Sequence, residues 1–215
     1  MSLNLIKSIV FSQESKLGRD KGSTKIIAVS KLQPNDRVKS ILESGHRIFG
    51  ENRVQEASEK WPEFKKNFNN VELHLLGPLQ RNKVRQAVEL FDFIHTIDSL
   101  KLAQRISLIA KDIGCCPKLF IQVNTGQEPQ KAGVKIEDLK ELLAICRELS
   151  LPVVGLMCIP PVEEDPYIHF NLLKSLREKY DVAELSMGMS GDFEKAILAG
   201  ASYIRVGSAI FGERP

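Results

Sequence analysis

Short runs of apolar residues alternate along this chain with longer stretches in which apolar residues recur every three or four positions. The short runs predict eight strands, at 25–29, 47–49, 71–75, 93–96, 118–123, 152–157, 183–186 and 203–206. The longer stretches predict helices at 35–44, 54–64, 82–90, 98–113, 137–149, 168–178 and 192–199. Apolar residues that recur every three or four positions are typical of helices, and short continuous apolar runs are typical of buried strands. The chain therefore alternates strands and helices from end to end.

This alternation predicts an α/β fold, a closed (β/α)8 TIM barrel. Residues 1–20 carry separated apolar positions and predict an extra N-terminal helix, which we expect to cover the base of the barrel. An open doubly wound sheet is the alternative. Its usual G-x-G-x-x-G after the first strand is absent, because the chain reads VSKLQP at 29–34. No compositional break marks a linker, so we expect a single domain over residues 1–215.

Composition narrows the expected location and partners. The net charge of +3 is spread along the chain and aromatic residues make up 7%, so we expect no nucleic-acid partner. No apolar run approaches the roughly 20 residues that span a bilayer, and no signal-peptide pattern opens the chain, so we expect no membrane association. The four cysteines lack CxxC spacing, and we expect Cys115 and Cys116 to be free thiols. A reduced, cytoplasmic protein is predicted.

Lys31 is the first candidate for chemistry. It closes the apolar run at 26–30 and precedes a helix-start signal at 34–36. An amine at the end of a buried strand lies in a low dielectric, which lowers its pKa and allows it to attack an aldehyde. A solvated lysine is the alternative interpretation.

A second candidate site follows the last two predicted strands. The segments 186–192 and 205–208 combine glycine with hydroxyl residues, and the loops at these two places hold phosphate in many barrels. Backbone N–H groups near Gly207, together with the hydroxyls of Ser190 and Ser208, would bind such an anion. Taken singly, Ser190 is equally an N-cap and Gly207 a tight-turn residue. The guanidinium of Arg205 needs a hydrogen-bond acceptor, which a ligand ring nitrogen or a ligand carboxylate would supply. A structural salt bridge within the protein is the alternative.

Other strand ends are polar as well. Asn52 is a candidate ligand donor or helix cap, and His74 and His95 are expected to make hydrogen bonds at the top of the barrel. Lys131, on the loop after the fifth strand, either lines the mouth or is solvated. No spacing suggests a metal site or a Ser-His-Asp triad.

In a closed barrel the first and eighth strands are neighbours, so Lys31 is expected beside the phosphate cradle. A lysine next to a phosphate site suits an aldehyde that carries a phosphate. Pyridoxal 5′-phosphate (PLP) fits this description, with Arg205 facing the pyridine nitrogen. A sugar-phosphate aldolase shares the first two features.

Several motifs resemble those of the pyridoxal phosphate homeostasis protein family, in the right order and over nearly the whole chain. They are AVSK at 28–31, FGENRVQE at 49–56, HLLGPLQRNK at 74–83, HTID at 95–98, GLMCIP at 155–160, SMGMSGD at 186–192 and RVGSAIFG at 205–212. Departures from the family pattern are mild. Leu76 stands where isoleucine is common, and the segment 161–167 looks short. The short segment leaves the contacts at the rim of the barrel and the binding of partners unassigned.

The resemblance implies a barrel similar to the N-terminal domain of alanine racemase. It implies PLP held as a Schiff base on Lys31, without catalytic turnover, by a protein that buffers or delivers the cofactor. Carried over by position, the implied cofactor-binding residues are Lys31, Asn52, His74, Met189, Ser190, Arg205, Gly207 and Ser208. Among them, Ser190, Gly207 and Ser208 match positions that contact the phosphate. Arg205 matches the position near the pyridine nitrogen. Implied partners are PLP and PLP-dependent apoenzymes, and the chain is expected to be a monomer or a weak homodimer.

A PLP-dependent amino-acid racemase is the alternative function. Racemisation needs bases on both faces of the substrate Cα. In racemases that resemble this domain the second base comes from a separate β-domain, which we expect to be missing because no sequence follows Pro215. An arginine at the pyridine nitrogen also makes a poor electron sink, because it does not protonate that nitrogen. The carrier is therefore the favoured prediction.

Overall fold

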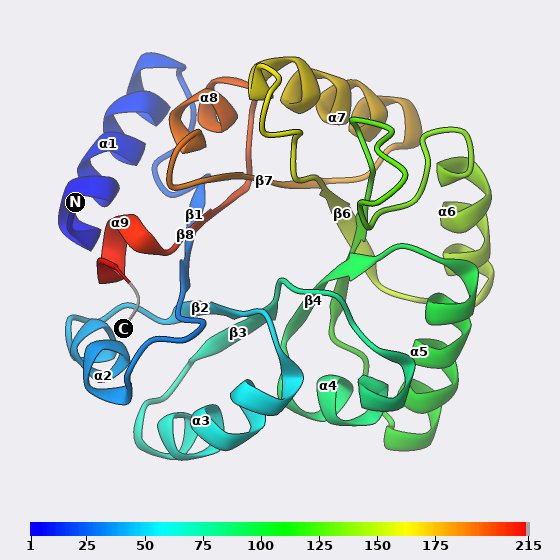
Figure 1. Ribbon diagram of the computed structural model, residues 1–215, viewed down its shortest axis with the longest axis horizontal. Coiled ribbons are helices and arrows are strands. Elements are labelled where there is room, and N and C mark those ends of the chain that lie inside the picture. The colour runs from blue at the N-terminus through cyan, green and yellow to red at the C-terminus, as the bar shows by residue number, and fades with distance from the viewer. Residues whose placement is uncertain (214–215) are drawn as a thin grey trace.

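Eight parallel strands form a closed barrel in the computed structural model, which describes residues 1–213. The strands are β1 (Lys25–Val29), β2 (Ile48–Glu51), β3 (Glu72–Leu75), β4 (Phe93–Ile97), β5 (Lys118–Gln122), β6 (Val153–Met157), β7 (Glu184–Met189) and β8 (Tyr203–Val206). Each strand pairs with the next, and β1 pairs with β8 from Lys25↔Tyr203 to Ala28↔Val206, which closes the ring. The predicted TIM barrel is confirmed (Figure 1).

Helices surround the strands as an outer ring (Figure 1). They are α1 (Leu3–Lys16), α2 (Asn35–Glu43), α3 (Val54–Asn67), η1 (Arg81–Lys83), α4 (Val84–Leu90), α5 (Leu100–Ile113), α6 (Leu139–Glu148), α7 (Pro166–Tyr180), α8 (Phe193–Leu198) and α9 (Ser208–Phe211). Local sequence sets their ends. Asp165 accepts a hydrogen bond from the Tyr167 N–H ahead of α7, and Gly114 ends α5 with a φ of 82°.

The N-terminal helix α1 is present, but it does not lie across the base of the barrel as expected. It packs on the flank, beside α8 and α9 (Figure 1). Its apolar side chains Leu3, Ile6 and Val10 are buried. The physical reason is that α9 has only four residues, so the flank beside α8 and α9 leaves apolar surface for α1 to cover. Leu3, Ile6 and Val10 join the apolar cluster there.

Side chains fill the interior of the barrel, so a ligand site must lie at its ends. The apolar cluster inside the ring contains Ile27, Leu76, Phe93, Phe120, Met157 and Tyr203. The rings of His74 and His95 stack on Phe93 and Phe120 with centroid distances of 4.4 and 4.3 Å. A larger apolar cluster fills the layer between the strands and the helices.

Strand β7 is longer than the sequence predicts, since it runs to Met189 and not to residue 186. Its pairing with β8 shifts register between Ser186 and Met189. Gly188 permits this path because its φ is 89° and a Cβ there would collide with Ala196. As a result, Ser186 lies inside the barrel and only the residues after Met189 form the loop.

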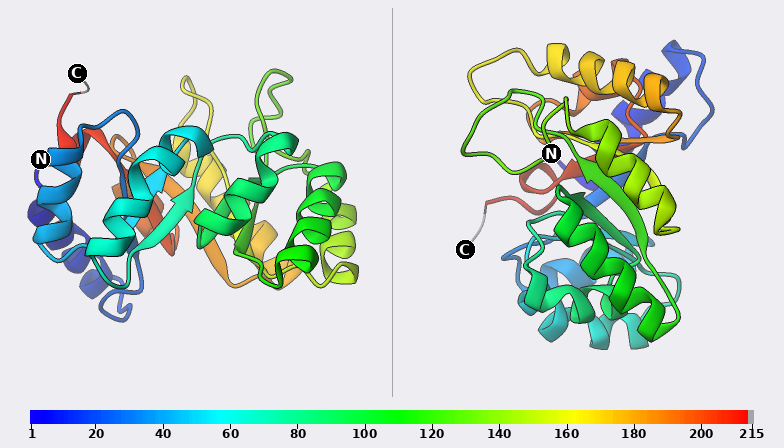
Figure 2. Two further views of the ribbon diagram at one scale, coloured as in Figure 1. Left: turned by 90° about the horizontal axis from the view of Figure 1, so that it is seen from below. Right: turned by 90° about the vertical axis from the view of Figure 1, so that its right-hand side faces the viewer.

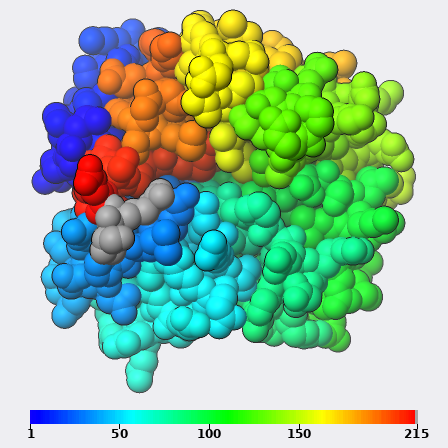
Figure 3. All heavy atoms as spheres, viewed as in Figure 1, coloured from blue at the N-terminus to red at the C-terminus, as the bar shows by residue number. Residues whose placement is uncertain are grey.

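The carboxyl ends of the strands form the mouth of the barrel. Figure 2 shows the loops after β5 and β6, in green and yellow, projecting beyond the helices at this end. In the space-filling view of the same face, these loops stand out as two mounds (Figure 3). Among residues 1–213, no helix combines the length and the apolar character needed to cross a bilayer.

Candidate functional site

A cavity of about 310 Å³ opens at the mouth of the barrel. Its wall combines apolar side chains with polar groups from the ends of several strands. Seven of the eight residues predicted to bind a cofactor line it: Lys31, Asn52, Met189, Ser190, Arg205, Gly207 and Ser208. The eighth, His74, is fully buried inside the barrel and is not part of the lining.

The turn that carries Lys31 is held from behind by helix α3. Lys60 Nζ donates to the Ser30 carbonyl oxygen at 3.0 Å and to Glu56 Oε1 at 2.9 Å. The same Glu56 oxygen accepts the Leu32 N–H at 2.6 Å. Leu32 has a φ of 58°, a left-handed conformation that costs a residue with a side chain about 1–2 kcal/mol. Both neighbours of Lys31 are thus tied to one ion pair, which offsets that cost and fixes the turn.

Glu51, at the end of β2, completes this cluster. Its side chain is fully buried, and Oε1 accepts hydrogen bonds from Ser30 Oγ at 2.7 Å, Trp61 Nε1 at 3.0 Å and Lys60 Nζ at 3.1 Å. Burial raises the pKa of Glu51, and the charge of Lys60 opposes that rise. Sequence reasoning did not assign this cluster. The four-residue spacing of Glu56 and Lys60 on a predicted helix was the available signal, and it indicates an ion pair but not its burial.

The loops after β7 and β8 meet beside this turn and form a cradle of donors. The Gly207 N–H donates to Ser190 Oγ at 3.3 Å, and Gly207 is the N-cap of α9. Ser208 begins that helix, and the first N–H groups of a helix have no partner within it. A Cβ at Gly207 would lie 3.3 Å from the Val29 carbonyl oxygen, so glycine allows β8 to end close to the Lys31 strand. Hydroxyls and N–H groups gathered in this way suit a phosphate.

Arg205 contributes a buried positive charge to the floor of the cavity. One terminal nitrogen, NH1, donates to Ser186 Oγ at 2.9 Å, and the other, NH2, donates to the Cys158 carbonyl oxygen at 2.8 Å. Burial lowers the pKa of Arg205, but a guanidinium stays protonated in proteins. Within residues 1–213 no carboxylate bonds to Arg205, so the salt bridge considered as its alternative role is not seen there.

A chain of hydrogen bonds runs from Arg205 through the barrel interior. Ser186 Oγ lies 2.9 Å from His95 Nδ1, His95 Nε2 lies 2.8 Å from His74 Nδ1, and His74 Nε2 lies 2.9 Å from Glu72 Oε1. A neutral imidazole donates through one ring nitrogen and accepts through the other, and the ionised carboxylate of Glu72 only accepts, so two neutral imidazoles fix the direction of every bond in the chain. Ser186 donates to His95, His95 donates to His74, and His74 donates to Glu72.

The pKa values in this chain agree with that direction. Burial lowers the pKa of His74 against the opposing effect of Glu72, and it lowers the pKa of His95 well below its usual value of 6.5. Both imidazoles are therefore neutral at pH 7, as the bonding requires. The net direction for Glu72 is also down: burial raises its pKa, and the bond to His74 together with the charges of Lys25 and Lys118 lowers it by more. His74 is thus connected to the cavity only through His95, Ser186 and Arg205, and it does not line the cavity.

Lys131 and the cysteines lie outside this cavity. Lys131 pairs with Glu128 at 2.6 Å, donates to the Pro160 carbonyl oxygen at 3.3 Å and lines a separate hollow on the loop after β5. All four cysteines are free thiols. Burial raises the pKa of Cys116 to about 11 and that of Cys158 to about 12, so neither forms a reactive thiolate at pH 7.

Comparison with known proteins extends these observations. The family model described as "Alanine racemase, N-terminal domain" matches residues 15–215. The pyridoxal phosphate homeostasis protein of Vibrio cholerae is 38% identical over 221 residues, which cover 97% of this chain and 93% of that protein. The protein of the same name from Escherichia coli is 35% identical over 224 residues, covering 99% of this chain and 95% of that protein.

A solved structure agrees with the sequence comparison. PipY of Synechococcus elongatus, whose structure was solved with PLP bound, superposes with a TM-score of 0.83 at 38% sequence identity. The match covers 94% of this chain and 100% of that one. Relatives and solved structure therefore agree over nearly the full length of the chain.

Proposed function

We propose a function for this chain, which belongs to the family of pyridoxal phosphate homeostasis proteins. It binds PLP as a Schiff base on Lys31, and it buffers or delivers the cofactor without catalytic turnover. PLP supplies an aldehyde, which an amine holds covalently but reversibly. One observation carries the proposal. A lysine at the end of β1 shares a single cavity with a cradle of hydroxyls and N–H groups at the ends of β7 and β8.

Each lining group has a chemical role in this proposal. The hydroxyls of Ser190 and Ser208 and the N–H groups after Gly207 hold the phosphate. Arg205, which the hydrogen-bond chain holds through Ser186, faces the pyridine nitrogen. Asn52 and Met189 border the ring, and His74 orients Arg205 from inside the barrel.

The carrier is favoured over a racemase by the ionisable groups that the cavity offers. Among the lining residues of the described chain, only Lys31 and Arg205 ionise. Racemisation needs a second base on the opposite face of the substrate Cα, and a guanidinium is not a base at pH 7. The proposal includes PLP-dependent apoenzymes as recipients, a monomer or weak homodimer, and a cytoplasmic location, which the four free thiols support.

Hydrogen exchange at Cα separates the two functions. The PLP-loaded protein is incubated with D- and L-alanine in deuterated buffer, and the Cα–H signals are followed by NMR. We expect exchange no faster than with the same concentration of free PLP. Exchange at an enzymatic rate would overturn the carrier and support the racemase.

A further inference from the structure

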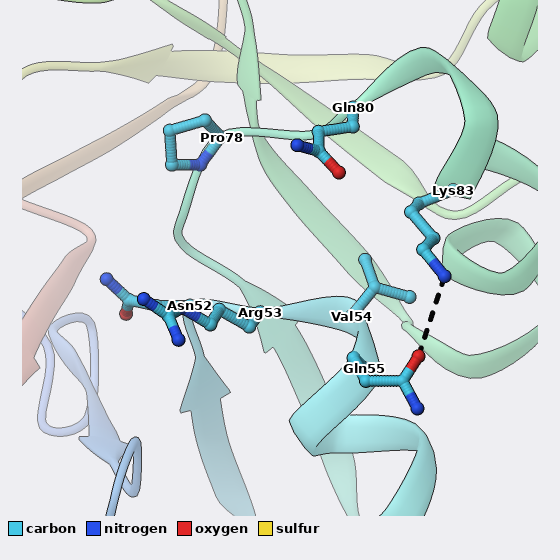
Figure 4. A pocket seen from close by; sticks show the side chains of 7 residues that line it. All are labelled: Asn52, Arg53, Val54, Gln55, Pro78, Gln80 and Lys83. Atoms are coloured by element: carbon cyan, nitrogen blue, oxygen red, sulfur yellow. Dashed lines mark hydrogen bonds between the residues drawn. The ribbon is translucent and has the colours of Figure 1, made fainter.

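A second, larger hollow of about 500 Å³ lies beside the proposed cofactor cavity. The loop that leads from β2 into α3 and the loop that leads from β3 into η1 form its walls (Figure 4). We call it the β2–β3 groove, and its lining residues are Asn52, Arg53, Val54, Gln55, Pro78, Gln80 and Lys83. Asn52 lines both hollows, so the groove adjoins the cofactor cavity.

The groove exists because the two loops meet at a glycine. A Cβ at Gly77 would collide with the Asn52 carbonyl oxygen. The Gly77 carbonyl oxygen also accepts a hydrogen bond from Thr96 Oγ1 at 2.9 Å, and the Leu76 N–H donates to the Glu51 carbonyl oxygen at 2.8 Å. These contacts fix both walls, so the groove is a formed feature of the barrel mouth.

The groove carries uncompensated positive charge. Arg53 and Lys83 line it, and no acidic residue does. Within residues 1–213 neither cation pairs with a carboxylate, and the bond of Lys83 to Gln55 Oε1, at 3.5 Å, is to a neutral amide. By contrast, Lys60 pairs with Glu51 and Glu56, and Lys131 pairs with Glu128. The groove therefore attracts an anionic group.

The exposure of its lining residues favours a polypeptide over a small molecule. Pockets for small ligands bury most of the ligand's surface. Here the side chains of Arg53, Gln55, Pro78 and Gln80 are exposed, as suits a chain that lies across the groove. Figure 4 shows Arg53 extending with Asn52 on one side of the groove while Gln55 and Lys83 meet on the other. Amide side chains both donate and accept, as the backbone of an extended peptide requires.

Exposed apolar side chains elsewhere on the mouth support the same interpretation. Leu32 is 55% exposed, Val162 90%, and Ile159 and Met189 38% each, and all four follow or end a strand at this face. Large exposed apolar side chains around an opening are typical of surfaces that bind proteins.

We propose that the β2–β3 groove docks an acidic segment of a protein that receives the cofactor. This inference rests on the proposed function, because a recipient exists only if the chain carries PLP. Docking at a groove that shares Asn52 with the cofactor cavity places the recipient beside the opening through which PLP leaves.

A fluorescein-labelled hexaglutamate peptide tests the proposal through its anisotropy with the full chain at low salt. We expect saturable binding that R53Q/K83Q weakens about tenfold, as the loss of two exposed charge contacts predicts. The matched control is K66Q/K111Q, which removes two exposed lysines near the carboxyl ends of α3 and α5, at the opposite end of the barrel. This control should bind the peptide like the unaltered chain.

Three outcomes would overturn the proposal: equal peptide binding by R53Q/K83Q and the control, equal binding of a hexaglutamine peptide, or tighter binding of a single-stranded DNA of the same charge. Failure of the groove is separable from failure of the cofactor site. R53Q/K83Q should keep the absorbance of bound PLP, whereas Lys31→Ala should lose that absorbance and still bind hexaglutamate.

Discussion

Lys60→Met tests whether the buried ion cluster behind Lys31 holds the turn in place. The substitution keeps an unbranched apolar side chain of similar length and removes the ammonium group. The ammonium makes three hydrogen bonds, to Glu51, to Glu56 and to the Ser30 carbonyl oxygen. Its removal leaves Glu51, which is fully buried, without a positive partner.

The expected cost is large because of this burial. The Lys60 and Glu51 side chains are 8% and 0% exposed, so solvent screens their pair very little. Breaking a buried pair by removing one partner typically costs about 3–5 kcal/mol in the free energy of unfolding. On a Glu51→Gln background, Lys60→Met should cost much less, since no buried charge is stranded.

The pH dependence has a definite sign. Burial already raises the folded-state pKa of Glu51 above its unfolded value, and the loss of Lys60 raises it further. A carboxyl group whose folded pKa is raised destabilises the fold above that pKa and ceases to do so as it is protonated. The loss in the free energy of unfolding caused by Lys60→Met, measured by urea unfolding, should therefore be larger at about pH 8 than at about pH 5.5. An equal loss at the two pH values, or a loss below about 1 kcal/mol, would show that Lys60 does not stabilise the fold by neutralising Glu51.

Three further predictions follow from the site. Changing Ser190 and Ser208 together to alanine should weaken PLP binding by about 1–3 kcal/mol in equilibrium dialysis, and an unchanged affinity would assign all the holding to backbone N–H groups. The rings of His74 and His95 should both titrate below the ordinary histidine pKa of 6.5, because burial lowers both pKa values, and a titration of either ring at or above 6.5 in NMR spectra would contradict this. Gly77→Ala should destabilise the fold by roughly 1–3 kcal/mol through overlap with the neighbouring loop, and unchanged urea unfolding would show that the loops do not meet.

The barrel was predictable because its signal is repeated. Each strand and helix carries its own hydrophobic period, and eight repeats leave few other folds. The candidate site followed from one topological rule, that residues after parallel strands converge at one face. That rule was sufficient to bring Lys31, Ser190 and Gly207 into one cavity.

The remaining features depend on tertiary packing, which no local pattern encodes. His74 lies near the end of its strand, but its side chain points into the barrel, and its depth depends on the tilt of neighbouring strands. Ser186 was expected to end the seventh strand, but β7 continues irregularly through Gly188 to Met189, and the hydrogen bond from Arg205 to Ser186 Oγ was not predicted. Lys60 reads as a surface lysine, and only the packing of α3 against the barrel shows that it is buried.

The absorbance spectrum of the protein mixed with PLP shows whether Lys31 holds the cofactor. We expect a near-visible band and, after borohydride reduction, a covalent PLP adduct on the peptide that contains Lys31, identified by mass spectrometry. Lys31→Ala should lose both the band and the adduct. A Lys31→Ala variant that keeps the band and is still labelled by borohydride would contradict the assignment of Lys31 as the residue that holds the cofactor.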